Sequence, residues 1–156
     1  QPVQTAAAPV RASFDGWALD ACPHHGPGLA PAAADGYHAV WFGERAGSQA
    51  VRTGRLDANG TPAGDVRTLP DERAEHADVI THGRRVAIVW RSFDAAASQT
   101  RLRAWLSADD GASFALHDLG STTDPNDHPR LVKDAAGNLF AVWRTAKKIR
   151  VEPLRP

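Results

Sequence analysis

The chain has 156 residues, with 18 basic and 18 acidic side chains and a formal net charge of zero. This balance argues against a nucleic-acid-binding surface, which requires an excess of Lys and Arg. No apolar run is long enough to span a membrane as a helix. The single cysteine, Cys22, allows no disulfide within the chain, so a domain of this size must depend on a buried apolar core.

The chain begins with a polar segment, residues 1–9, that is rich in Ala and Pro. This composition is typical of a flexible lead-in that follows a cleaved signal peptide. We therefore expect a protein that is secreted or located in the periplasm, and the high content of Ala and Arg with little Lys indicates a GC-rich bacterial genome. A short strand, residues 10–14 (VRASF), is predicted directly after this segment.

Three stretches of the remaining chain share one pattern. Each contains a histidine, a short apolar run, a turn and a second apolar run that ends in Val-Trp, at Trp41, Trp90 and Trp143. The three Trp residues lie 49 and 53 residues apart. A repeat of this length is typical of architectures built from stacked, similar units.

Each repeat is predicted to contain short strands separated by turns. The runs around the Trp residues are apolar on both faces, as in strands that are covered on both sides. In chain order, the expected strands are 28–30, 37–42, 49–56 and 65–69, then 78–80, 86–91, 100–107 and 114–119, then 130–132, 139–144 and 147–152.

This order predicts an all-β fold, a β-propeller built of four-stranded antiparallel blades. Blade 1 is expected over about 20–70, blade 2 over 75–120 and an incomplete blade 3 over 126–156. A sandwich of about ten strands is the alternative, although sandwiches seldom show so regular a repeat.

Three blades are too few to close a ring, because propellers have typically about 4–8 blades. The third repeat lacks its fourth strand, while residues 10–14 are a spare strand ahead of blade 1. Two explanations remain open. Either the chain forms a homodimer and is half of a six-bladed ring, or the missing N-terminal half belongs to a longer polypeptide.

One segment adds a family resemblance. The stretch SADDGASF, with Ser107, Asp109, Gly111 and Phe114 at its defining positions, resembles the Asp-box of sialidase-like (BNR) β-propellers. The resemblance implies a structural role, in which the aspartate caps a hairpin between the third and fourth strands of a blade and the glycine takes a positive φ.

The catalytic residues of sialidases have no counterpart in this sequence. The Phe-Arg-Ile-Pro motif of that family does not occur, and Tyr37 is the single tyrosine. Arg91 and Arg144 follow Trp residues and are expected in second strands, away from the central channel. Glu75 and Asp127, together with Asp20, are acidic residues on the channel side, but they form no recognisable pair.

Histidines precede the innermost strand of all three blades. His25, His76 and His128 are therefore expected to gather at one end of the channel, and convergent imidazoles suit a cation. Cys22 and His24 are their neighbours in CPHHG, and a thiolate with imidazoles suits copper or zinc. Haem is the lesser alternative.

Acidic residues near these histidines would line the same site, namely Asp20, Asp78 and Asp127. The sequence therefore predicts a binding module with a transition metal or metal cofactor at the channel mouth. A sialidase-like glycoside hydrolase is the alternative, and a structural or protein-interaction propeller is the second alternative.

Overall fold

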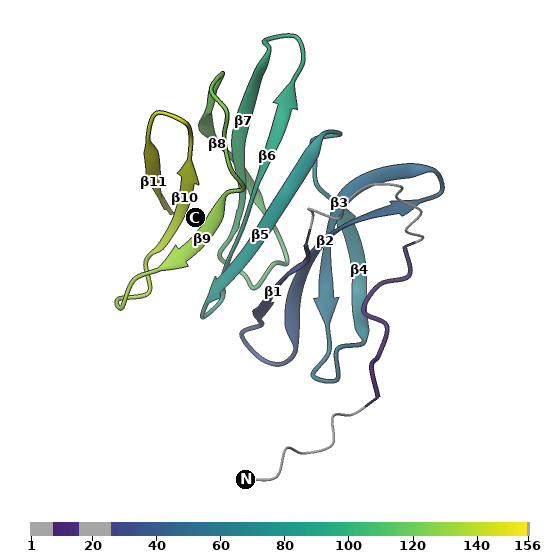
Figure 1. The fold of residues 1–156 in the computed structure, drawn as a ribbon. Coiled ribbons are helices and arrows are strands. Elements are labelled where there is room, and N and C mark those ends of the chain that lie inside the picture. Colours follow the sequence, from purple (N-terminus) through teal and green to yellow (C-terminus); the bar gives the residue numbers. More distant parts are fainter. Residues whose placement is uncertain (1–7, 16–25, 156) are drawn as a thin grey trace.

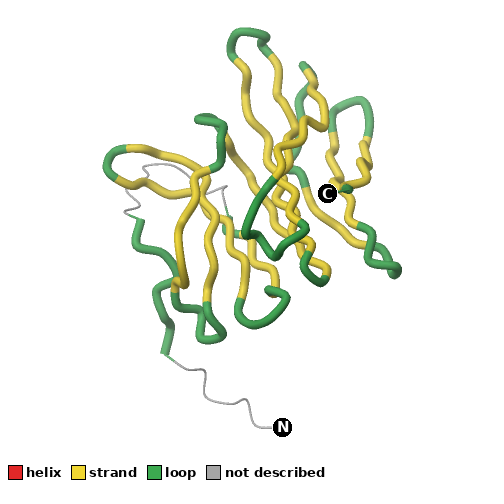
Figure 2. The backbone as a smooth tube through the Cα atoms, turned by 180° about the vertical axis from the view of Figure 1, so that it is seen from behind, coloured by secondary structure: helices red, strands yellow, loops and turns green. Residues whose placement is uncertain are grey.

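The computed structural model describes residues 8–15 and 26–155, in which every regular element is a β-strand (Figures 1 and 2). Blade 1 comprises β1 (Gly28–Pro31), β2 (Tyr37–Arg45), β3 (Ser48–Leu56) and β4 (Pro62–Thr68). Blade 2 comprises β5 (Ala74–His82), β6 (Arg85–Asp94), β7 (Gln99–Ser107) and β8 (Ala115–Thr122). Blade 3 comprises β9 (Arg130–Lys133), β10 (Leu139–Arg144) and β11 (Ile149–Leu154).

Each blade is one antiparallel sheet whose strands follow one another in chain order. The first strands of the blades are neighbours, because β5 contacts both β1 and β9 (Figure 1). This arrangement confirms the prediction of antiparallel propeller blades. A sandwich would gather the strands into two facing sheets, and the three consecutive sheets rule it out.

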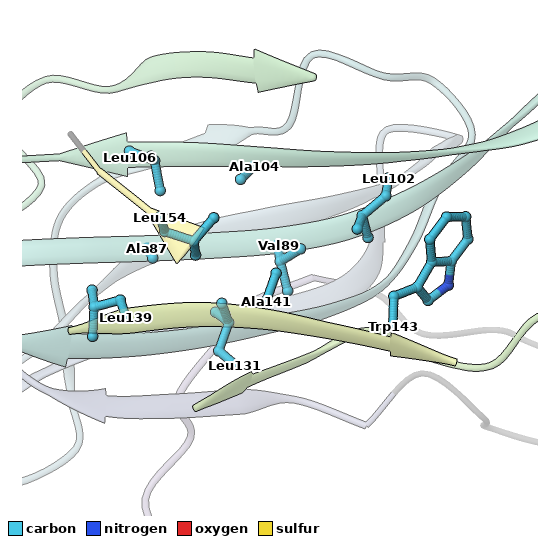
Figure 3. Packing of buried hydrophobic residues seen from close by; sticks show 10 residues of the cluster. All are labelled: Ala87, Val89, Leu102, Ala104, Leu106, Leu131, Leu139, Ala141, Trp143 and Leu154. Atoms are coloured by element: carbon cyan, nitrogen blue, oxygen red, sulfur yellow. The ribbon is translucent and has the colours of Figure 1, made fainter. Parts of the chain in front are cut away.

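Two apolar cores lie between the blades, one on each face of blade 2. Alternating side chains along its strands point to opposite faces, so blade 2 contributes to both cores. The core between blades 2 and 3 contains Val89, Leu102, Leu139 and Trp143 (Figure 3). The core between blades 1 and 2 includes Val40, Val51, Val79, Ile88 and Trp90.

The tryptophan of each second strand is held by a hydrogen bond from its indole, and in blades 2 and 3 it faces the preceding blade. In blade 2, the indole Nε1 of Trp90 donates to Asp71 Oδ2 over 2.6 Å. Asp71 precedes β5 and also accepts from Arg103 Nη1 at 2.8 Å. The side chain of Trp90 is completely buried, so this hydrogen bond satisfies a donor that water does not reach.

The other two blades repeat this contact, which we call the indole latch. In blade 3, Trp143 Nε1 donates to the carbonyl oxygen of Asp127 at 3.0 Å. In blade 1, Trp41 Nε1 donates to Asp15 Oδ2 at 2.6 Å. In all three blades the acceptor comes from the segment ahead of the blade, so the latch fixes where each sheet begins.

Residues 8–15 form no strand in the described structure. They run along blade 1, and Asp15 anchors them through Trp41 and Arg45. An extended segment becomes a strand only where it pairs with a sheet edge, and residues 10–14 have no such partner here. None of the described residues belongs to a helix of the length and apolarity that a membrane span needs.

Removing the carboxylate of the blade 2 latch should destabilise the protein. Asp71→Ala leaves the Trp90 N–H without its acceptor, and we expect the free energy of unfolding to fall by about 1–3 kcal/mol. Urea unfolding followed by tryptophan fluorescence measures the change. The neighbouring Glu72 is exposed, so Glu72→Ala is the matched control. Equal stability of the two variants would contradict this role of the latch.

Candidate functional site

The candidate site lies at the end of the sheets where β5 and β9 begin, which we call the leading end. His76 occupies a β-bulge in β5, between the register positions of Glu75 and Asp78. Its φ is +51°, a backbone conformation that is uncommon for residues other than glycine. Such strain persists only where the surroundings impose it, and it is concentrated at functional sites.

The bulge brings two of the predicted histidines into contact. The rings of His76 and His128 are stacked, with centroids 3.4 Å apart and planes inclined by 14°. His76 is only 9% exposed, whereas His128 is exposed in the loop that leads to β9. The sequence places His76 ahead of its strand, but β5 begins at Ala74 and includes it.

A carboxylate and a guanidinium complete the leading end. Glu75 Oε1 lies 3.0 Å from Arg91 Nε, and Glu75 Oε2 lies 3.7 Å from His76 Nε2. Arg91 Nη1 also donates to the carbonyl and side-chain oxygens of Asn126, at 2.8 and 3.0 Å. We call His76, His128, Glu75, Arg91 and Asn126 the axial cluster. It joins blade 2 to the loop that opens blade 3.

Burial and the charges around the axial cluster favour the neutral form of His128. Burial lowers the pKa of His128, and the positive charges of Arg91 and Arg130 lower it further. Asp127 and Glu75 oppose this effect and are outweighed. A neutral His128 suits the stacked arrangement, because two imidazolium rings in contact would repel each other.

Four of the predicted site residues, Asp20, Cys22, His24 and His25, lie outside the described residues. Within the described ranges, no group of three or more His, Cys, Asp or Glu side chains is arranged to hold a metal ion. His76 and His128 therefore make a pair there rather than a complete metal centre, since zinc sites need at least three protein ligands.

The two remaining acidic candidates both make structural contacts, Asp78 with the backbone and Asp127 with an arginine side chain. Asp78 Oδ2 accepts a hydrogen bond from the backbone N–H of Leu131 at 2.9 Å, which ties β5 to β9. Asp127 Oδ2 accepts from Arg144 Nε at 2.6 Å. Asp78 is thus engaged between the first strands, whereas Asp127 is more than half exposed and lies beside His128 in the chain.

The Asp-box residues form a capped hairpin between β7 and β8. Ser107 Oγ donates to Asp109 Oδ1 at 2.7 Å and accepts from the N–H of Gly111 at 2.9 Å. Gly111 has a φ of +80°. Hydrogen bonds from Ser113 and Ser107 lower the pKa of Asp109. Phe114 stacks on Trp105, with ring centroids 5.2 Å apart.

The residue beside the Asp-box aspartate makes a contact that the sequence did not predict. Asp110 reaches blade 1, where its Oδ1 lies 2.9 Å from His38 Nε2 and its Oδ2 accepts from Arg55 Nη1 at 2.8 Å. Burial acts to raise the pKa of Asp110, but hydrogen bonds from His38, the Ala33 N–H and Arg55 lower it to about 2. This cluster locks blades 1 and 2 together at the trailing end, opposite the axial cluster.

Polar clefts flank the axial cluster. One of about 280 Å³ lies at blade 3 and is lined by Pro125, Asn126, Asp127, Arg144, Thr145 and Ala146. Another of about 420 Å³ occupies the corresponding place in blade 2, where Pro70, Asp71 and Arg73 contribute to its wall. The leading end is therefore hollowed and polar, as a site for a hydroxyl-rich or charged ligand requires.

Three consecutive antiparallel sheets with neighbouring first strands define this chain as part of a β-propeller. Solved structures support this class. An α-L-arabinofuranosidase (CtGH43) from Clostridium thermocellum matches 78% of this chain and 41% of its own, at 16% identity and a TM-score of 0.52. An endo-arabinase from Bacteroides thetaiotaomicron matches 83% of this chain and 55% of its own, again at 16% identity and a TM-score of 0.52.

The chain thus spans about half the length of the solved structures that it matches. At this identity, the likeness establishes the fold and not the activity. No family model, the sialidase family included, matches the sequence, and no curated protein matches it either.

The histidine stack should make stability depend on pH. The pKa of His128 is lower in the folded chain than its ordinary value near 6.5, so the unfolded chain binds more protons as the pH falls through that value. The free energy of unfolding should therefore decrease on acidification from about pH 8 to pH 5.

His128→Gln should weaken this pH dependence, as measured by urea unfolding at a series of pH values. His117 lies on the outermost strand β8, and His117→Gln is the control. If both variants keep the slope of the wild-type protein, His128 does not titrate in this way.

Proposed function

We propose that this chain is part of a glycan-acting β-propeller of the glycoside hydrolase kind and that its leading end holds the sugar. The supporting observation is the axial cluster, where the Glu75 carboxylate lies between Arg91 and a stacked pair of imidazoles. The matched solved structures are an arabinofuranosidase and an endo-arabinase, so arabinose-containing glycans are the substrates to test first.

The chemistry of the axial cluster suits a sugar. Carboxylate and guanidinium groups exchange strong hydrogen bonds with hydroxyl groups, and the exposed face of a planar ring packs against the C–H face of a sugar. Glycoside hydrolysis requires two carboxyl groups on either side of the scissile bond. Glu75 and Asp127 are two carboxylates of the leading end that come from different blades, and each is paired with an arginine.

Loss of the Glu75 charge should weaken glycan binding. Since a hydrogen bond to a charged group contributes about 1.5–3 kcal/mol, we expect Glu75→Gln to reduce affinity for arabino-oligosaccharides by at least about tenfold. Isothermal titration calorimetry measures binding, and an aryl α-L-arabinofuranoside assay measures hydrolysis. Asp118→Asn, an exposed carboxylate on the outermost strand β8, is the matched control. Unchanged affinity in Glu75→Gln, or no binding of any glycan by the wild-type protein, would refute the proposal.

A metal site is the second candidate function. The contact between His76 and His128 supports it, because it brings together imidazoles from two different blades. We propose copper or zinc as the ion, with Cys22, His24 and His25 as the further ligands, in a secreted or periplasmic protein. Haem remains the lesser alternative cofactor.

Elemental analysis of untagged protein tests the metal site. Protein that contains stoichiometric copper or zinc should lose it in His76→Ala and in His128→Ala, and His117→Ala should retain it. Wild-type protein without bound metal after incubation with copper or zinc would exclude this candidate. If neither glycan nor metal binds, a structural or protein-interaction role is the remaining explanation.

A further inference from the structure

The two end blades expose apolar positions that are buried elsewhere in the same chain. One residue of each first strand pairs with the residue two positions before the Trp of its blade. These three equivalent residues are Leu29, Val79 and Leu131. Val79 and Leu131 face a preceding blade and are 6% and 9% exposed. Within the described residues no blade precedes Leu29, which is 58% exposed. The front face of blade 1 is thus not covered by another blade in this part of the chain.

Blade 3 shows the same difference on its back face. Ile149 occupies the position in blade 3 that Leu102 occupies in blade 2. Each is the partner of the residue that follows the Trp of its blade. Leu102 is fully buried against blade 3, whereas Ile149 is 65% exposed. Val151 and Val132 lie in the same sheet and are 56% and 43% exposed. The back face of blade 3 is therefore the complementary half of an interface that the chain already builds twice.

The number and order of the strands also indicate that further blades adjoin blades 1 and 3. Blades 1 and 2 each have four strands, and the described part of blade 3 has three, which leaves β11 as its outer edge. The outer strand β4 ends at Thr68, shortly before the latch residue Asp71. Residues 10–14 likewise come shortly before the latch residue Asp15. They occupy the sequence position of a fourth strand that belongs to a blade in front of blade 1.

We propose that a second copy of this chain supplies both missing neighbours. Blade 3 of each copy packs its back face on the front face of blade 1 of the other, and residues 10–14 pair with the edge of β11 in the partner. The two contacts are identical and related by a twofold axis, so the assembly closes as a ring of six blades. This inference is independent of the proposed glycan function.

Light scattering after gel filtration tests the assembly. The wild-type protein should have about twice the 16.7 kDa mass of one chain. Leu29→Asp and Ile149→Asp each place a charge in both contacts and should weaken dimerisation by at least about tenfold. Leu116 is 49% exposed on β8, away from both faces, so Leu116→Asp is the matched control and should remain dimeric.

Mixing the two variants distinguishes this assembly from any other dimer. A Leu29→Asp copy keeps its blade 3 face and an Ile149→Asp copy keeps its blade 1 face, so an equimolar mixture should regain a dimer through one intact contact. A misfolded variant could not restore the dimer in this way. A wild-type mass of one chain, dimeric single variants or a mixture that stays monomeric would each overturn the proposal.

Discussion

The whole structure depends on one constraint, which is that each sheet has two apolar faces and both must be buried. Blade 2 meets this need, because Ile88 and Trp90 are fully buried against blade 1 and Val89 and Leu102 against blade 3. In the described part of the chain, blades 1 and 3 each pack against one neighbouring blade. Within the described residues, the chain is therefore a stack of three layers with a complete middle layer, and the stability of the outer layers depends on their contact with it.

The repeated Val-Trp pattern made the blades predictable. A run that is apolar on both faces requires a strand covered on both sides, and three such runs at similar spacing require three similar sheets. The ends of the strands were harder to predict from the sequence. The start of β5 includes His76, whose bulge interrupts the alternation on which the prediction relied. Residues 10–14 have a strand-like composition but pair with no sheet edge in the described structure, and the sequence does not show whether a strand-like segment finds such an edge.

The candidate site was predictable in part for the same reason. His76 and His128 precede neighbouring first strands, so their proximity follows from the blade order. The blade order does not predict that Arg91 belongs to the axial cluster, because a residue in the second strand is expected to lie away from the channel. The long side chain of Arg91 reaches Glu75 and the loop of the next blade. Contacts of this kind depend on the rotation between adjacent sheets, which the pattern of apolar residues does not encode.

The two ends of the sheets differ in a way that bears on function. At the trailing end, Asp110 ties the Asp-box hairpin to His38 and Arg55 of blade 1, and Arg85 donates to the carbonyl of Gly137 in blade 3. These hydrogen bonds join all three blades. The leading end holds His76 at a φ of +51°, an exposed His128 and polar clefts, whereas the trailing end has its own positive-φ residue, Asp110, and a smaller polar pocket beside His38. The contacts between blades at the trailing end can hold the bulge at His76 in one geometry, since strain of this kind persists only where the surroundings impose it.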